Sequence, residues 1–112
     1  MNAPEQRRSP RKRPEHSVTV TDAITGQTLG HVGNLSNNGM LLIGQCVPRS
    51  EAIYQVHLPL PRHDGGMPSI EIGIQEQWHE PAASPGQTWV GYRIIAIGNM
   101  DAMHLDDWLQ QA

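Results

Sequence analysis

The feature that most constrains the fold is a strict alternation of apolar and polar positions over residues 70–75. Ile70, Ile72 and Ile74 fall on one side of the chain, with polar residues or glycine between them. A period of two is typical of a β-strand with one buried and one solvated face. The same phase continues to Trp78, which favours a core position for its indole ring. Such a strand has to bury its isoleucine face against further strands.

Five more segments carry strand signals, at residues 17–21, 28–35, 40–43, 52–58 and 88–97. Segments rich in Gly, Pro or Asp separate them at 22–27, 44–50, 59–68 and 80–87, with Gly26 at the expected positive-φ position of the first. Every residue of 40–43 is apolar, so we expect this strand to be buried on both faces. Gly30, Gly33 and Gly39 predict bulges or close backbone approaches. The pattern predicts a small all-β domain with six strands.

The C-terminus has a different period. Ala102, Leu105, Trp108 and Leu109 recur at three- and four-residue spacings, which predicts a short helix from about residue 99. Asn99 is the candidate N-cap. So short a helix is stable only when packed, and we expect it to plug an open end of the sheet or cover an edge.

Length and composition limit the class of protein. A chain of 112 residues predicts one domain. Its single cysteine, Cys46, leaves no internal disulfide framework and fits a reducing compartment. We find no secretory signal and no apolar run near the ~20 residues of a membrane span. We therefore expect a cytoplasmic protein.

Charge is distributed unevenly. Residues 1–13 carry five basic residues and one acid, whereas the remainder carries three basic residues and ten acids. A general nucleic-acid binder would show a basic face on its folded part. An acidic body with a basic arm instead fits a domain that meets a small anion with one segment.

Two polar motifs stand out. Arg7 and Arg11 are spaced Arg-x-x-x-Arg in a basic arm, with Arg8 beside them, and residues 34–39 read NLSNNG between two apolar runs. Asn, Ser and Gly favour tight turns and leave polar groups at a corner. Read separately, the corner is an ordinary hairpin turn and the arm a solvated basic tail.

Together and in this order, the motifs resemble the PilZ domain, a bacterial receptor domain for cyclic di-GMP that pairs an Arg-x-x-x-Arg arm with an Asp/Asn-x-Ser-x-x-Gly corner. The resemblance implies a six-stranded antiparallel β-barrel over residues 15–112 and a flexible basic arm over residues 1–14. Gly91 is similar to a late glycine of the family, and Ile94 stands where a Phe is more usual. Asn34 replaces the acid often found there, which lowers the expected affinity because an amide accepts less strongly than a carboxylate.

The resemblance also implies the ligand-binding residues, which are Arg7, Arg8, Arg11, Asn34, Ser36 and Gly39. Arginine can bind phosphate in a bidentate manner, pair with guanine O6 and N7, and stack on a base. Arg13, Trp78 and Arg93 are further candidates, although Trp78 also fits the core and Arg93 also fits an ordinary exposed strand charge.

The implied function is non-catalytic. A bacterial second-messenger receptor would bind cyclic di-GMP, order its arm and so present a new surface to a downstream protein partner in signal transduction. We expect no cofactor beyond this ligand, and no metal, because the six histidines form no tight ligand pattern. His57, His63 and Asp64 come nearest to one. No phosphate-binding loop or nucleophile elbow indicates an enzyme.

Two alternatives stay open. The chain could be a PilZ-like protein-interaction module without ligand binding, an option that the intact Arg-x-x-x-Arg spacing disfavours. It could also be a small barrel that binds single-stranded nucleic acid, which the acidic body and scarce aromatic residues disfavour.

Overall fold

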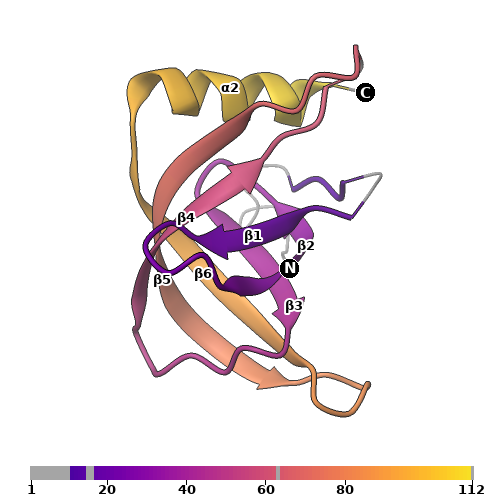
Figure 1. The fold of residues 1–112 in the computed structure, drawn as a ribbon, viewed down its shortest axis with the longest axis vertical. Helices are drawn as coiled ribbons and strands as arrows, with labels where there is room; N and C mark the ends of the chain where they lie inside the picture. Colours follow the sequence, from indigo (N-terminus) through magenta and orange to yellow (C-terminus); the bar gives the residue numbers. More distant parts are fainter. Residues whose placement is uncertain (1–10, 15–16, 63, 112) are drawn as a thin grey trace, which may run out of the picture.

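The computed structural model describes residues 11–14, 17–62 and 64–111, which form a closed antiparallel β-barrel (Figure 1). Its strands are β1 (Thr19–Asp22), β2 (Thr28–Leu35), β3 (Gly39–Gly44), β4 (Ile53–Pro59), β5 (Ser69–Pro81) and β6 (Thr88–Ile97). Their order is β1-β2-β3-β6-β5-β4, and β1 pairs with β4 to close the barrel. The helix α2 (Asn99–Gln110) follows β6. The predicted six-stranded barrel with a C-terminal helix is confirmed.

The barrel interior is mostly aliphatic, and alternate residues of each strand face inward. Ile70, Ile72 and Ile74 of β5 are at most 1% exposed, and the opposing Val56 and Leu58 of β4 are fully buried. Full burial of such a side chain stabilises a fold by about 1.5–3 kcal/mol. The isoleucine face read from the sequence is therefore the barrel core.

Strand β3 departs from the sequence prediction. Met40 and Leu42 face the core, but Leu41 and Ile43 are only half-buried. A strand of a closed barrel has one inner and one outer face, so the expected burial on both faces was wrong. Leu41 instead lies on the outer wall.

The turn between β1 and β2 forms as predicted. The Asp22 carboxylate accepts hydrogen bonds from the backbone N–H groups of Ile24 and Thr25, at 2.7 and 3.0 Å. Gly26 has a φ of 78°, a left-handed conformation that glycine adopts without steric cost. The turn sets the register in which β1 and β2 begin to pair.

Strand β2 contains the irregularities that its glycines predicted. A Cβ atom on Gly30 would lie 2.7 Å from the Ile43 carbonyl oxygen, so this position requires close backbone approach. The β2–β3 register skips Gly33, passing from the pair Val32–Leu42 to the pair Asn34–Leu41. A one-residue bulge re-aims the side chains that follow it. The bulge sets the position of Asn34 opposite Leu41.

Helix α2 lies across one end of the barrel (Figure 1). Its Leu105 and Trp108 are buried, and the Asp101 carboxylate accepts a hydrogen bond from the Glu71 backbone N–H at 3.1 Å. The N-cap is Gly98 rather than Asn99, because Gly98 keeps extended dihedral angles and no side chain caps the first turn. None of the described helices is long and apolar enough to cross a membrane.

The end of the basic arm contacts the barrel. Lys12 and Leu35 exchange two backbone hydrogen bonds, of 2.8 and 2.9 Å. The Lys12 ammonium donates to the backbone carbonyls of Trp108 and Gln111 and lies 4.1 Å from the centre of the Trp108 ring. Residues 1–10 are outside the described part of the chain, so the predicted flexibility of the arm stays a prediction.

Candidate functional site

The turn at residues 36–39, within the NLSNNG corner, is held by backbone and side-chain hydrogen bonds among its own residues. The Ser36 backbone N–H donates to the Gly39 carbonyl at 2.9 Å, and the Gly39 N–H donates to the Ser36 hydroxyl at 3.2 Å. The same hydroxyl lies within hydrogen-bonding distance of Asn38 Oδ1, at 3.0 Å. Ser36 is 1% exposed, so in this arrangement it shapes the corner.

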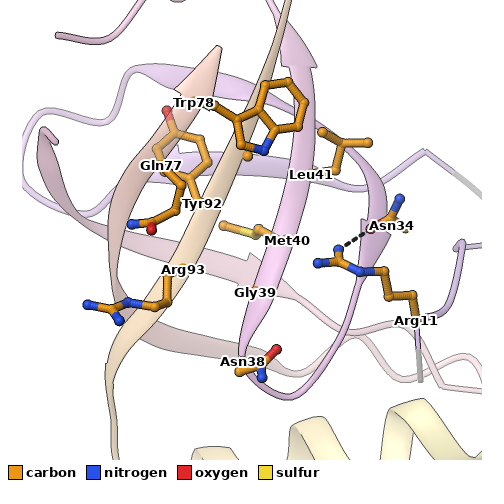
Figure 2. Close-up of a pocket in the computed structure, with 11 residues that line it drawn as sticks. Arg11, Asn34, Asn38, Gly39, Met40, Leu41, Gln77, Trp78, Tyr92 and Arg93 are labelled. Carbon is orange, nitrogen blue, oxygen red and sulfur yellow. Dashed lines mark hydrogen bonds between the residues drawn. The ribbon is translucent and has the colours of Figure 1, made fainter. Parts of the chain in front are cut away.

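Arg11 and Asn34 meet beside this corner. The Arg11 Nη1 donates to Asn34 Oδ1 at 2.6 Å, although the two residues are 23 positions apart (Figure 2). This bond fixes the Asn34 amide with its oxygen toward the arginine. Its Nδ2 donors make no hydrogen bond within the described residues, and the guanidinium, which has five N–H donors, keeps several for another acceptor.

Gly39 allows the strands and the arginine to come together. A Cβ atom there would lie 2.9 Å from the Tyr92 carbonyl oxygen and 3.9 Å from the Arg11 Nη2. The first of these distances is shorter than a real carbon–oxygen contact, so a side chain would force β3 away from β6. The glycine thus allows β3 and β6 to pair closely beneath the guanidinium.

A cleft of about 500 Å³ opens on this outer wall (Figure 2). It is lined by Arg11, Asn34, Asn38, Gly39, Met40, Leu41, Gln77, Trp78, Gly91, Tyr92 and Arg93. Within the described part of the chain, the lining contains two arginines and no acidic residue. In Figure 2, Arg11 and Asn34 lie on one side of β3, with Trp78 and Arg93 toward β5 and β6. The cleft is therefore suited to an anionic ligand with a flat polar group.

Trp78 reaches this cleft because the β5–β6 register shifts between Glu76 and Trp78. The shift ends the inward phase of the isoleucine face, and Trp78 is 45% exposed. Its predicted core position was wrong. A Cβ atom on Gly91 would overlap the indole at Nε1, so the absence of a side chain at Gly91 lets the ring lie against β6.

Glu76 takes the last inward position before the shift and is 2% exposed. Its carboxylate accepts a hydrogen bond from the Glu51 backbone N–H at 2.8 Å and contacts His79 Nδ1 at 2.7 Å. These bonds, the Glu51 one first, lower the pKa of the Glu76 carboxyl below its ordinary value. The Glu76 carboxylate thus connects β5, two residues before Trp78, to Glu51 in the loop between β3 and β4.

Comparisons with known proteins bear on the fold. No family model and no curated protein sequence matches the chain. Among solved structures it resembles the inhibitor of motility MotI/DgrA from Bacillus subtilis, with a TM-score of 0.73 and 13% sequence identity. The match covers 92% of this chain and 49% of the other, so the chain spans about half the length of that protein. At this identity the likeness supports a shared, PilZ-like fold.

Several predicted site residues meet in the cleft, namely Arg11, Asn34, Gly39, Trp78 and Arg93. Ser36 is buried within the corner, and Arg13 lines an adjoining cleft. Arg7, Arg8 and His63 lie outside the described residues. Among the described residues, no three His, Cys, Asp or Glu side chains gather as a metal site.

Sequence reasoning missed two polar lining residues, Asn38 and Gln77. Asn38 belongs to the NLSNNG corner, so its place in the motif was the available signal. Gln77 is the extra residue at the β5 register shift, and no local sequence pattern marks it.

Proposed function

We propose that the chain is a non-catalytic receptor for cyclic di-GMP. The observation that carries the proposal is the Arg11 guanidinium, which bonds to Asn34 and lies over Gly39, across the cleft from Trp78 and Arg93; no described residue of that lining is acidic. Arg11, the second arginine of the Arg-x-x-x-Arg motif, thus meets Asn34 of the corner motif on a barrel of the expected topology.

Each part of the cleft suits one part of the ligand. Arg11 and Arg93 offer charged donors for phosphate oxygens. The Asn34 Nδ2 can donate to guanine O6 or N7, and the exposed face of Trp78 can stack on a base. Gly39 allows the ligand to approach the backbone. Arg7 and Arg8 would close over the ligand from the N-terminal side.

We also propose that the protein signals from the bacterial cytoplasm through a downstream partner. Residues 1–10 contain two prolines, two arginines and no large apolar residue after Met1. Such a segment gains little from burying its own surface, so ligand phosphates would supply the energy that orders it. The ordered arm would then present a new surface to a protein partner.

Calorimetric titration with cyclic di-GMP tests the proposal. Hydrogen bonds to charged groups are worth roughly 1.5–3 kcal/mol, so we expect Arg11→Ala to weaken binding about ten- to a hundredfold. Asn34→Ala should weaken it in the same direction. Arg49→Ala, an exposed arginine outside the cleft, is the matched control. Parent-like affinity in Arg11→Ala would refute the assignment.

Two competing ligands test specificity. Cyclic di-AMP should bind much more weakly, because adenine has an N6 donor where guanine has the O6 acceptor. Equal affinity would mean that only phosphate is recognised. Stronger binding of a single-stranded oligonucleotide would favour a nucleic-acid-binding barrel, and no binding of any of the three would favour a protein-interaction module.

A further inference from the structure

A second cleft of about 470 Å³ adjoins the first on the outer wall. Its lining includes Arg13, Ser17, Gly33 and Trp89, together with Asn34 and Leu41, which also line the first cleft. Among the described residues, none that lines this cleft is acidic. The two clefts therefore form one surface that Asn34 and Leu41 divide.

The second cleft repeats the architecture of the first. Trp89 on β6 is half-buried, and a Cβ atom on Gly33 would lie 2.9 Å from its ring atom Cζ3. Gly33 is the bulge residue of β2. Each cleft thus pairs an accessible indole ring with a glycine that makes room for it, Trp78 with Gly91 and Trp89 with Gly33.

The arm supplies one cation to each cleft. Successive side chains of an extended segment point to opposite sides. Lys12 is directed to the end of α2, while Arg11 lines the first cleft and Arg13 the second. Two residues of extended chain place the Cα atoms of the arginines about 7 Å apart.

The glycines beneath the two indole rings are separated by one strand, an arrangement that suits a ligand with two bases. The glycines beneath the rings lie on β6 and β2, and β3 runs between those strands. Two inter-strand spacings amount to roughly 10 Å. One mononucleotide is too small to engage both rings and both arginines, whereas a cyclic dinucleotide carries two bases and two phosphates.

We propose that the second cleft is a second subsite for the same ligand molecule. One guanine and one phosphate occupy the cleft of Trp78 and Arg11, and the other guanine and phosphate occupy the cleft of Trp89 and Arg13. The ligand straddles Leu41. This inference rests on the proposed function and extends its site to residues outside the two sequence motifs.

Titration of variants in the second cleft tests this subsite. A base–aromatic stack is worth enough that we expect Trp89→Leu to weaken cyclic di-GMP binding about tenfold. Trp89→Phe keeps an aromatic face and should retain most of the affinity. Arg13→Ala changes an exposed side chain, so it tests the cleft without risk to the core, and it should weaken binding by a similar factor. The expected stoichiometry is one ligand per chain.

The outcomes separate the two proposals. If the parent binds, Arg11→Ala binds poorly, and both Trp89→Leu and Arg13→Ala bind like the parent, the ligand uses the first cleft alone and the second subsite is wrong. Two ligands per chain, with the second lost in Trp89→Leu, would also overturn the shared-molecule arrangement. A parent that binds no cyclic di-GMP overturns the proposed function itself, whatever the second-cleft variants do.

Discussion

At the scale of single residues, Glu76 is the last inward-facing residue of β5 before its register with β6 shifts. An isolated buried carboxylate would be costly, but this one has the Glu51 N–H and the His79 ring as partners. Glu51 itself has a positive φ of 63°, a conformation that costs a non-glycine residue free energy. The hydrogen bond to Glu76 therefore helps to keep this loop in a strained shape.

In the Glu76→Gln variant, the stability of the fold should fall less steeply as the pH is lowered. The pKa of Glu76 is depressed in the folded state, so the carboxylate stabilises the fold above its unfolded pKa. That stabilisation is lost as the pH falls through the folded pKa. We expect the variant to melt below the parent at pH 7 and the gap to shrink as the pH is lowered. Melting curves from pH 7 to pH 3 measure it, and a gap that stays constant would contradict the assigned linkage.

The position of Trp78 shows why the sequence could not predict this region. The alternation of Ile70, Ile72 and Ile74 correctly predicts inward-facing core positions. Extending this period of two residues from Ile74 through Glu76 assigns Trp78 to the interior as well. The phase breaks where β5 gains an extra residue against β6, directly after Glu76, whose carboxylate bonds to Glu51, 25 positions away. A contact at that sequence separation leaves no trace in local periodicity.

At the scale of elements, the end of the arm binds the C-terminal end of α2 through Lys12. Helix α2 has no basic residue in its last turn, where a cation would favourably oppose the helix dipole. Lys12 supplies that cation from the opposite end of the chain, bonding to the carbonyls of Trp108 and Gln111 at 2.7 and 3.1 Å. Lys12, which lies between the two cleft-lining arginines, thus holds the end of the C-terminal helix against the arm.

Lys12→Met should loosen α2 while keeping most of the side-chain volume. The variant loses two hydrogen bonds from a partly exposed ammonium group, so we expect unfolding to become easier by about 1 kcal/mol. Urea denaturation measures the change, and hydrogen exchange should rise in residues 105–111. Arg13→Met is the control, because Arg13 is exposed and makes no hydrogen bond to the described residues. Equal destabilisation by both variants would contradict the role of Lys12.

The sequence predicted α2 but not how it is attached. Its apolar spacing correctly assigned Leu105 and Trp108 to the buried side. Neither the cap at Gly98 nor the partner at Lys12 follows from that spacing. The Lys12 contact depends on the arm pairing with Leu35, and that register exists only once the corner and the barrel have formed.

At the scale of the whole molecule, the barrel closes without the arm. All six strands lie between Thr19 and Ile97, and β1 pairs with β4 to close the barrel, so residues 11–14 add only the bridge between Lys12 and Leu35. Strand periodicity, turn residues and the motif pair were enough to predict this architecture. They could not predict that two clefts share a wall, because that depends on the bulge at Gly33 and on side chains of β5 and β6.

Two truncated chains separate the arm's part in stability from its part in binding. Composition alone predicts that removing the arm leaves the melting temperature unchanged, but the contacts of Lys12 with Leu35, Trp108 and Gln111 revise this. We expect a chain that begins at Arg11 to melt like the full chain. A chain that begins at Pro14 should still fold and should melt about 5 °C lower, since each kcal/mol corresponds to roughly 4–8 °C in a domain of this size. The chain from Arg11 should bind cyclic di-GMP more weakly than the full chain, through loss of Arg7 and Arg8, and the chain from Pro14 should not bind it detectably.

If the chain from Pro14 melts at the same temperature as the full chain, the Lys12 contacts add nothing to the stability of the barrel. If the chain from Arg11 binds as tightly as the full chain, residues 1–10 do not contact the ligand, and the proposed ordering of the arm is wrong.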